Sequence, residues 1–411
     1  MSQVAGRVSP AASAGSAAAP GRAPARAGIG MFLAIILMAI NLRTIVVSLP
    51  PLVEDVRADL GLSGAVGGLL TTLPVLCFGL LAPLAPRLAR RVPIERLIVA
   101  CGLVTAGAAA LRGAGGVALL FAGSLLAGGG VALAQAVLPM FVRSRFPGQA
   151  GSLMGAFTMS LTLGGTIAAG ATVPLERLLD GGWEVGLAVW ALPAALATLL
   201  WLPAALGPGT VVSGDPPAAL MRRPLAWAIA LYFGVQSTAF YAGLAWLPSI
   251  MRDEGYSADE AGALLALSAL PSLLPAFLVP VLAARRPRQS GLLIGFVALV
   301  VVALVGLLVA PRSAPLWMVV LGLGQGGTLG LGLILPVLRG GDAATVASMT
   351  GMTLCVGYLL AATGPALLGA VHDISGNWTA PLVLLTAIAA LQLIPGLVAT
   401  RDRTLSAAGA T

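Results

Sequence analysis

Long apolar runs separated by short polar segments fill almost the whole chain after residue 28. An α-helix needs about 20 apolar residues to cross the hydrocarbon core of a bilayer, and runs of about that length recur along the sequence. The pattern predicts an all-α membrane protein with twelve transmembrane helices. They are expected at residues 29–50, 64–86, 94–113, 116–140, 150–172, 185–205, 225–249, 259–283, 290–310, 315–338, 346–370 and 380–399.

The second six runs repeat features of the first six. Pro83 recurs 197 residues later as Pro280, and Leu49-Pro50 recurs 198 residues later as Leu247-Pro248. Six runs followed by six in the same orientation form a parallel repeat, an arrangement found in transporters built from two bundles. The expected organisation is a disordered N-terminal tail (1–28), an N-terminal six-helix bundle (29–205), a cytoplasmic linker (206–224), a C-terminal six-helix bundle (225–399) and a C-terminal tail (400–411).

Composition supports a lipid environment. Of the 411 residues, 58% are hydrophobic and only 9% are charged, whereas soluble domains carry about 25% charged residues. The net charge of +8 does not indicate nucleic-acid binding, because the arginines lie in short clusters between apolar runs and form no basic stripe. We therefore expect the lipid bilayer, and no nucleic acid, as a partner.

Arginine placement predicts the orientation. The chain has 23 basic residues and no lysine. With a cytoplasmic N-terminus, seventeen arginines fall on the cytoplasmic side and five in outer loops, among them Arg112, while Arg43 remains alone inside a run. Because positive residues accumulate in cytoplasmic loops, we expect a multi-pass protein of the cytoplasmic (inner) membrane with both termini in the cytoplasm.

Arg43 is the first candidate for function. It lies about 21 Å from the start of its run at the helical rise of 1.5 Å per residue, where a charge costs about 2.5–3.5 kcal/mol to insert. None of the predicted membrane-spanning cores supplies an acidic partner for it. One hypothesis is that an anionic or strongly polar substrate supplies the missing partner. The alternative is an arginine that extends toward the outer surface and pairs with Glu54 or Asp55.

Further polar residues lie at comparable depths. Gln236 and Tyr241 fall within residues 225–249, and Gln325 falls within 315–338. Asn41 lies near Arg43, but a regular helix directs the two side chains away from each other, so either one packs against neighbouring helices or the helix is distorted there. All of these polar side chains could line a cavity or could form hydrogen bonds between helices.

The sequence resembles the major facilitator superfamily, and within it the cyanate permease and 2-nitroimidazole transporter family. The resemblance is carried by Asn41-Leu-Arg43, Gly68-Leu-Leu-Thr-Thr-Leu-Pro74, Leu138-Pro-Met-Phe with Phe146-Pro147, and Trp246-Leu-Pro248. It implies a central cavity lined by the first, fourth, seventh and tenth spans. The substrate-binding residues would then be Asn41, Arg43, Gln236, Tyr241 and Gln325.

One superfamily motif is altered in this sequence. The loop after the second span reads Ala85-Pro-Arg-Leu-Ala-Arg-Arg91, with Pro86 at the position of the usual aspartate. The resemblance implies a gating role at the cytoplasmic loop for Arg87, Arg90 and Arg91, while the charge relay through the aspartate is in doubt. Gly322 to Gly327 matches GxGxxG, but it follows no strand and is interpreted as a helix-packing face.

The sequence therefore predicts a secondary active transporter that moves a small polar or anionic solute, cyanate-like or nitroimidazole-like, by alternating access. A multidrug or metabolite efflux transporter of the same superfamily is the alternative, and a non-transporting receptor is a further one. Without lysine there is no Walker A motif, so no ATP is expected. No catalytic constellation, metal site or cofactor motif is found, so we expect no enzyme. The protein is expected to be a monomer. Coupling of transport to a proton is one of the alternatives that the sequence leaves open.

Overall fold

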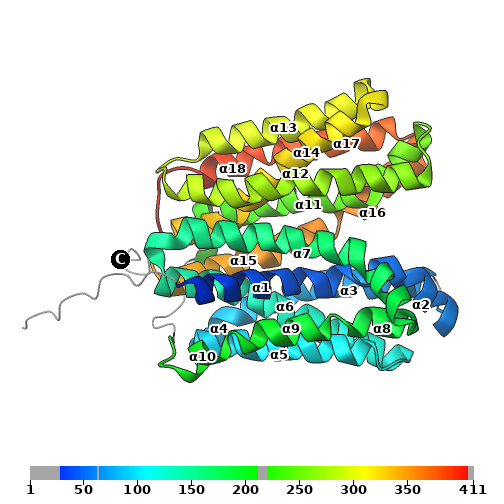
Figure 1. Cartoon of the computed structure of the whole chain (residues 1–411). Helices are drawn as coiled ribbons and strands as arrows, with labels where there is room; N and C mark the ends of the chain where they lie inside the picture. The colour runs from blue at the N-terminus through cyan, green and yellow to red at the C-terminus, as the bar shows by residue number, and fades with distance from the viewer. Residues whose placement is uncertain (1–27, 63, 212–219, 406–411) are drawn as a thin grey trace, which may run out of the picture.

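The computed structural model describes residues 28–62, 64–211 and 220–405, which are almost entirely helical (Figure 1). The predicted N-terminal tail up to residue 27 and the middle of the predicted linker, 212–219, lie outside the described residues. The first half contains α1 (Ile29–Val47), α2 (Val53–Leu60), α3 (Gly64–Leu81), α4 (Ala85–Ala89), α5 (Ile94–Arg112), α6 (Val117–Arg145), α7 (Ala150–Leu179), α8 (Gly182–Ala188), α9 (Ala191–Leu199) and α10 (Leu202–Leu206). The second half contains α11 (Pro224–Asp253), α12 (Ala258–Ala284), α13 (Ser290–Val309), α14 (Ala314–Arg339), α15 (Ala343–Ala361), α16 (Gly364–Ser375), α17 (Thr379–Leu391) and α18 (Leu393–Ala399).

The membrane-spanning elements agree with the prediction. In the described part of the chain, eleven helices or joined helices are long and apolar enough to cross a bilayer, and a shorter apolar helix, Leu73–Ala89, belongs to the second predicted span. Short 3₁₀ turns or bends join successive helices in some spans. In the second span the 3₁₀ turn Ala82–Leu84 contains Pro83, which has no N–H group for the helical ladder. The twelve-helix, all-α fold is confirmed.

The helices form two bundles that lie side by side (Figure 1). The N-terminal bundle holds α1 to α10 and the C-terminal bundle holds α11 to α18, with α7 and α15 between them in this view. We call the end where α1 begins and α18 ends the termini end. The opposite end carries α2, α8 and α16, which pack mainly on helices of their own bundle.

Glycines allow α14 to pack closely on α12. A Cβ atom added at Gly322 would lie 2.0 Å from the carbonyl oxygen of Ser268, and one added at Gly326 would lie 2.1 Å from that of Ser272. Neither position can hold a larger residue unless the helices separate, because carbonyl oxygens of the backbone do not move aside as a flexible side chain does. The interpretation of the GxGxxG sequence as a packing face is confirmed.

Glycines also bring the two bundles together near the termini end. A Cβ atom at Gly155 of α7 would lie 2.5 Å from the carbonyl oxygen of Phe277 in α12. On the other side of the molecule, a Cβ atom at Gly351 of α15 would lie 3.2 Å from the carbonyl oxygen of Ala82. Arg143, in the last turn of α6, donates to the carbonyl oxygen of Gly341 at 3.1 Å. These contacts hold the bundles together at the termini end.

Arg112 differs from its predicted place. The sequence put it in an outer loop, but it lies in the last turn of α5 and is 0% exposed. Its guanidinium donates to the carbonyl oxygen of Ile45 near the end of α1 and, at 3.1 Å, to the hydroxyl of Ser124. The hydroxyl of Ser48 donates to the same Ile45 carbonyl at 3.3 Å. Arg43 is therefore not the only arginine inside the predicted spans, because Arg112 is fully buried and caps a carbonyl of α1.

Candidate functional site

The structure places Arg43 at the junction between the bundles. Helix α1 is continuous from Ile29 to Val47, so Arg43 projects from a regular helix. Its side chain passes Gly165 of α7, where an added Cβ atom would lie 3.2 Å from the Arg43 Cγ. The guanidinium Nη1 donates to the hydroxyl of Tyr241 in α11 at 3.4 Å. Arg43 and Tyr241, two of the predicted site residues, thus meet across the two bundles.

A second polar pair joins the bundles beside the first. Gln135 of α6 donates through Nε2 to the hydroxyl of Tyr358 in α15 at 3.0 Å. The side chain of Tyr358 lies close to the guanidinium of Arg43. We call these four side chains (Arg43, Gln135, Tyr241 and Tyr358) the interbundle cluster. Two members come from each bundle, so a relative movement of the bundles must rearrange it.

Aromatic rings surround the interbundle cluster. The ring centroids of Tyr241 and Tyr358 lie 6.4 Å apart. Phe78 of α3 lies 5.0 Å from Tyr358, and Phe233 of α11 lies 5.7 Å from it. Both phenylalanine rings pack against Tyr358, so they limit the space on that side of the cluster.

The interbundle cluster is rich in hydrogen-bond donors. The two tyrosine oxygens accept hydrogen bonds from Arg43 and Gln135, which leaves the proton of each tyrosine hydroxyl available to a further acceptor. In the described part of the chain, Arg43 has no carboxylate within ion-pair distance. Asp55, one of the two predicted partners, forms no ion pair with Arg43, and the side chain of the other, Glu54, lies outside the described part. A site with donors and one uncompensated positive charge selects acceptors and anions.

Asn41 does not join the interbundle cluster. It is 3% exposed, and its Nδ2 donates to the carbonyl oxygen of Leu37 at 2.7 Å within α1. The side-chain oxygen of Asn41 is buried without a hydrogen-bond partner. The regular helix separates Asn41 from Arg43 as the helical period requires, and of the two alternatives for this segment the structure has the undistorted helix.

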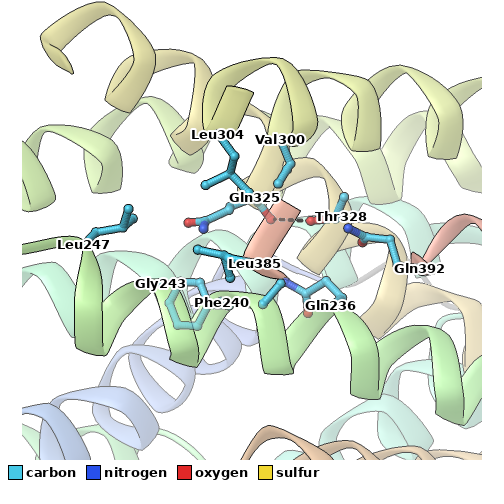
Figure 2. Close-up of a pocket in the computed structure, with 11 residues that line it drawn as sticks. Gln236, Phe240, Gly243, Leu247, Val300, Leu304, Gln325, Thr328, Leu385 and Gln392 are labelled. Carbon is cyan, nitrogen blue, oxygen red and sulfur yellow. Dashed lines mark hydrogen bonds between the residues drawn. The ribbon is translucent and has the colours of Figure 1, made fainter. Parts of the chain in front are cut away.

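Gln236 and Gln325 meet at a different place, inside the C-terminal bundle (Figure 2). They line a small cavity that also involves a third glutamine, Gln392, which the sequence analysis did not single out. The volume open to the centre of a water molecule is about 10 Å³, which is enough for about one water. The side-chain oxygen of Gln392 is buried and unpartnered. The lining residues are Gln236, Ala239, Phe240, Gly243, Leu247, Val300, Leu304, Gln325, Thr328, Leu385 and Gln392.

The three arginines of the altered motif lie around the end of α4. Arg87 and Arg91 are exposed, while Arg90 is partly buried and has an interaction partner. Pro86, at the position of the usual aspartate, packs against α15. A Cβ atom added at Gly351 would lie 3.6 Å from the Pro86 Cγ. Apolar packing therefore occupies the place where the family motif puts a charge.

Two members of the interbundle cluster were not among the predicted site residues. Gln135 was recognisable as a polar residue in an apolar run, but its depth did not indicate its direction. Tyr358 is one of only four tyrosines in the chain, and that scarcity in an apolar run was the available signal. For metal binding, no group of three or more His, Cys, Asp or Glu side chains is arranged suitably among the described residues.

Known proteins that are similar to this chain support its fold and show which family the chain belongs to. The family model described as Major Facilitator Superfamily matches residues 31–362. The chain is 37% identical to the 2-nitroimidazole transporter of Escherichia coli (strain K12), over 91% of this chain and 96% of that protein. It is 32% identical to the cyanate transport protein CynX of the same organism, over 85% of this chain and 91% of that protein.

Solved structures show the same architecture at lower sequence identity. The proton:xylose symporter XylE, bound to 6-bromo-6-deoxy-D-glucose, superimposes with a TM-score of 0.75. The match covers 92% of this chain and 97% of that protein at 13% identity, so it bears on the fold alone. With the family model spanning most of the residues and two transporters at more than 30% identity over most of their length, the chain belongs to the major facilitator superfamily and is a transporter of that family.

Proposed function

We propose that the protein is a secondary active transporter that binds a small anion, or a small acceptor-rich polar solute, at the interbundle cluster and moves it by alternating access. The observation that carries the proposal is the environment of Arg43. Its charged guanidinium lies between two bundles, donates to the hydroxyl of Tyr241, and has no carboxylate partner in the described part of the chain. A charge retained at such a cost in an apolar region usually serves a ligand.

The chemistry of the interbundle cluster supports the solute class. An anion would accept hydrogen bonds from the guanidinium and from the free protons of Tyr241 and Tyr358. The rings of Phe78 and Phe233 restrict the space around these donors. Relatives named as transporters of 2-nitroimidazole and of cyanate act on solutes that are small and carry acceptor atoms, in agreement with this class.

The position of the interbundle cluster supports alternating access. Because two of its members belong to each bundle, rocking of one bundle against the other changes the site as it changes access. The bundles are in contact at the termini end, and the arginine distribution supports a cytoplasmic location for that end. The conformation described here would then receive solute from outside.

A ligand-stability screen on the purified full-length protein tests the proposal. Wild type, Arg43→Ala and Arg312→Ala are compared against cyanate, 2-nitroimidazole, other small anions and nitrogen heterocycles. Arg312 is an exposed arginine at the opposite end and serves as the matched control. A ligand at 100 times its Kd stabilises the folded state by about 2.7 kcal/mol.

We expect at least one compound to raise the melting temperature of wild type and of Arg312→Ala but not of folded Arg43→Ala. If a compound stabilises all three proteins equally, the solute class stands but the site is elsewhere. If no small anion or heterocycle stabilises wild type, the solute class is wrong.

A further inference from the structure

The chain after α18 folds back onto the end of α14. We call residues 400–405 the return segment. The backbone N–H of Leu405 donates to the carbonyl oxygen of Arg339 at 2.7 Å, and the N–H of Gly341 donates to the carbonyl oxygen of Leu405 at 2.7 Å. These bonds form a parallel bridge between Gly340 and Leu405. The return segment is therefore a structured part of the C-terminal bundle, and the Leu405 side chain packs on the main hydrophobic core.

The loop that receives the return segment is also a contact point between the bundles. Arg143 of the N-terminal bundle donates to the carbonyl oxygen of Gly341 at 3.1 Å. Gly340 and Gly341 connect α14 to α15, and paired glycines have large conformational freedom when nothing constrains them. The return segment thus constrains this loop from one side while Arg143 contacts it from the other.

Arg339 fixes the base of the return segment. It is 3% exposed and donates to the carbonyl oxygens of Ala399 and Thr400, each at 3.1 Å, and to the side-chain oxygen of Gln289. Buried charge-assisted hydrogen bonds of this kind are among the stronger ones. The return segment accordingly begins from a rigid point and directs Leu405 toward the loop.

The N-terminal bundle contains a related arrangement. Arg145 binds the carboxylate of Glu95 at 2.8 Å, and that carboxylate accepts from the N–H of Thr210 at 2.8 Å, just after α10. Arg145 and Glu95 are 50 residues apart, as are Arg339 and Gln289. Each bundle thus uses an arginine at the end of its fourth span to hold the chain that leaves its sixth. Among the described residues, it is the segment held in the C-terminal bundle that reaches a loop contacted by the other bundle.

We propose that the return segment is an intramolecular latch that favours the conformation closed at the termini end. It holds the Gly340–Gly341 loop in the shape that Arg143 contacts, so the contact between the bundles forms without the entropic cost of ordering that loop. Because the Arg143 bond exists only when the bundles meet at this end, a loop held in this shape stabilises that state relative to the open one.

Distance measurements between spin labels test the latch in the full-length protein. Arg91→Cys and Arg286→Cys place labels at exposed positions of the two bundles, each two residues after the end of a helix, α4 or α12. These helix ends lie near the termini end (Figure 1). In this background Cys77, Cys101 and Cys355 are replaced by serine. Leu405→Pro removes the N–H that donates to Arg339. Leu405→Ala is the matched control, because it shortens the side chain and keeps both backbone hydrogen bonds.

We expect Leu405→Pro to raise the ratio of long to short distances about fivefold, the effect of one lost backbone hydrogen bond, and Leu405→Ala to leave the ratio unchanged. Arg143→Ala should raise the ratio similarly. The double variant with Arg143→Ala and Leu405→Pro should show the same ratio as the single variant that has the larger effect. A chain ending at Thr400 retains every membrane span and gives a second test if Leu405→Pro does not fold.

An unchanged ratio in Leu405→Pro or, where that variant does not fold, in the shortened chain would overturn the proposal. An equal increase in Leu405→Ala would also overturn it, since the effect would then come from side-chain packing. The measurement uses no ligand, so its outcome is independent of the proposed solute.

Discussion

Arg43 donates a hydrogen bond to Tyr241, which lies 198 residues later in the chain and in the other bundle. The same offset relates Leu49-Pro50 to Leu247-Pro248, so Arg43 and Tyr241 occupy equivalent positions in the two halves of the repeat. An arginine in one half thus contacts the tyrosine that replaces it in the other. The two halves differ in chemistry at the point where they meet, and the candidate site includes that point.

Removing single tyrosine hydroxyls tests the interbundle cluster. Tyr241→Phe and Tyr358→Phe keep the rings and delete one donor each, so we expect each to weaken binding of a stabilising anion about tenfold, as for one lost hydrogen bond to a charged group. The Kd is measured by titrating the ligand in thermal unfolding. Tyr256→Phe is the control, because that hydroxyl donates to Pro311 at 3.0 Å, away from the cluster. Equal Kd values in all four proteins would exclude the hydroxyls from the site.

Gly326→Ala tests the packing of α14 on α12. The added methyl group would lie 2.1 Å from the Ser272 carbonyl oxygen, so the helices must separate, at a cost of about 1–3 kcal/mol. Gly295→Ala in α13 is the matched control, since nothing lies within 4 Å of its added Cβ and alanine favours a helix over glycine. We expect the melting temperature to fall for Gly326→Ala and to stay or rise for Gly295→Ala. A fall of the same size in both variants would count against the packing argument.

Arg112→Ala tests the cap on α1. It removes the guanidinium donor from the Ile45 carbonyl, which then keeps only the Ser48 hydroxyl as a side-chain donor among the described residues, and from the Ser124 hydroxyl, and it opens a cavity. We therefore expect a loss of about 2–4 kcal/mol of stability. Arg312→Ala, at an exposed position, should change stability by less than about 0.5 kcal/mol. Thermal unfolding in one detergent compares the two. Similar melting temperatures would mean that the buried guanidinium contributes nothing to the fold.

Glu95→Ala tests the anchor of the chain after α10. Glu95 is 1% exposed and binds Arg145 and Thr210, so its loss should free the connection that follows α10 at residues 207–211. We expect cleavage of that connection by a nonspecific protease to become about three to ten times faster, since local opening sets the rate. Glu254→Ala, exposed at the opposite end, is the control and should be cleaved like wild type. Unchanged cleavage in Glu95→Ala would show that the anchor does not restrain the linker.

The sequence determined the helices better than their contacts. The lengths of the apolar runs predicted the spans because a bilayer imposes them. The helical period also separated Asn41 from Arg43 correctly, since it requires only a regular helix. Arg112 was misplaced because an arginine at the end of an apolar run resembles a loop residue until the packing of α1 against α5 is known.

The sequence could not show which polar side chains face the junction of the two bundles. Gln236 and Gln325 were grouped with Arg43 by depth, yet they face a cavity within the C-terminal bundle. Tyr358 was overlooked although it contacts Gln135. Depth follows from counting residues along one helix, whereas the choice between the inside of a bundle and the junction of two bundles depends on how each helix is rotated.

The glycine contacts at Gly155 and Gly351 affect how fast the bundles can part. Both contacts place a bare backbone against a carbonyl group of the other bundle. Separation there would break dispersion contacts that are individually weak. The hydrogen bond from Arg143 to Gly341 must also break when the termini end opens, so we expect that bond to slow the opening more than either glycine contact does.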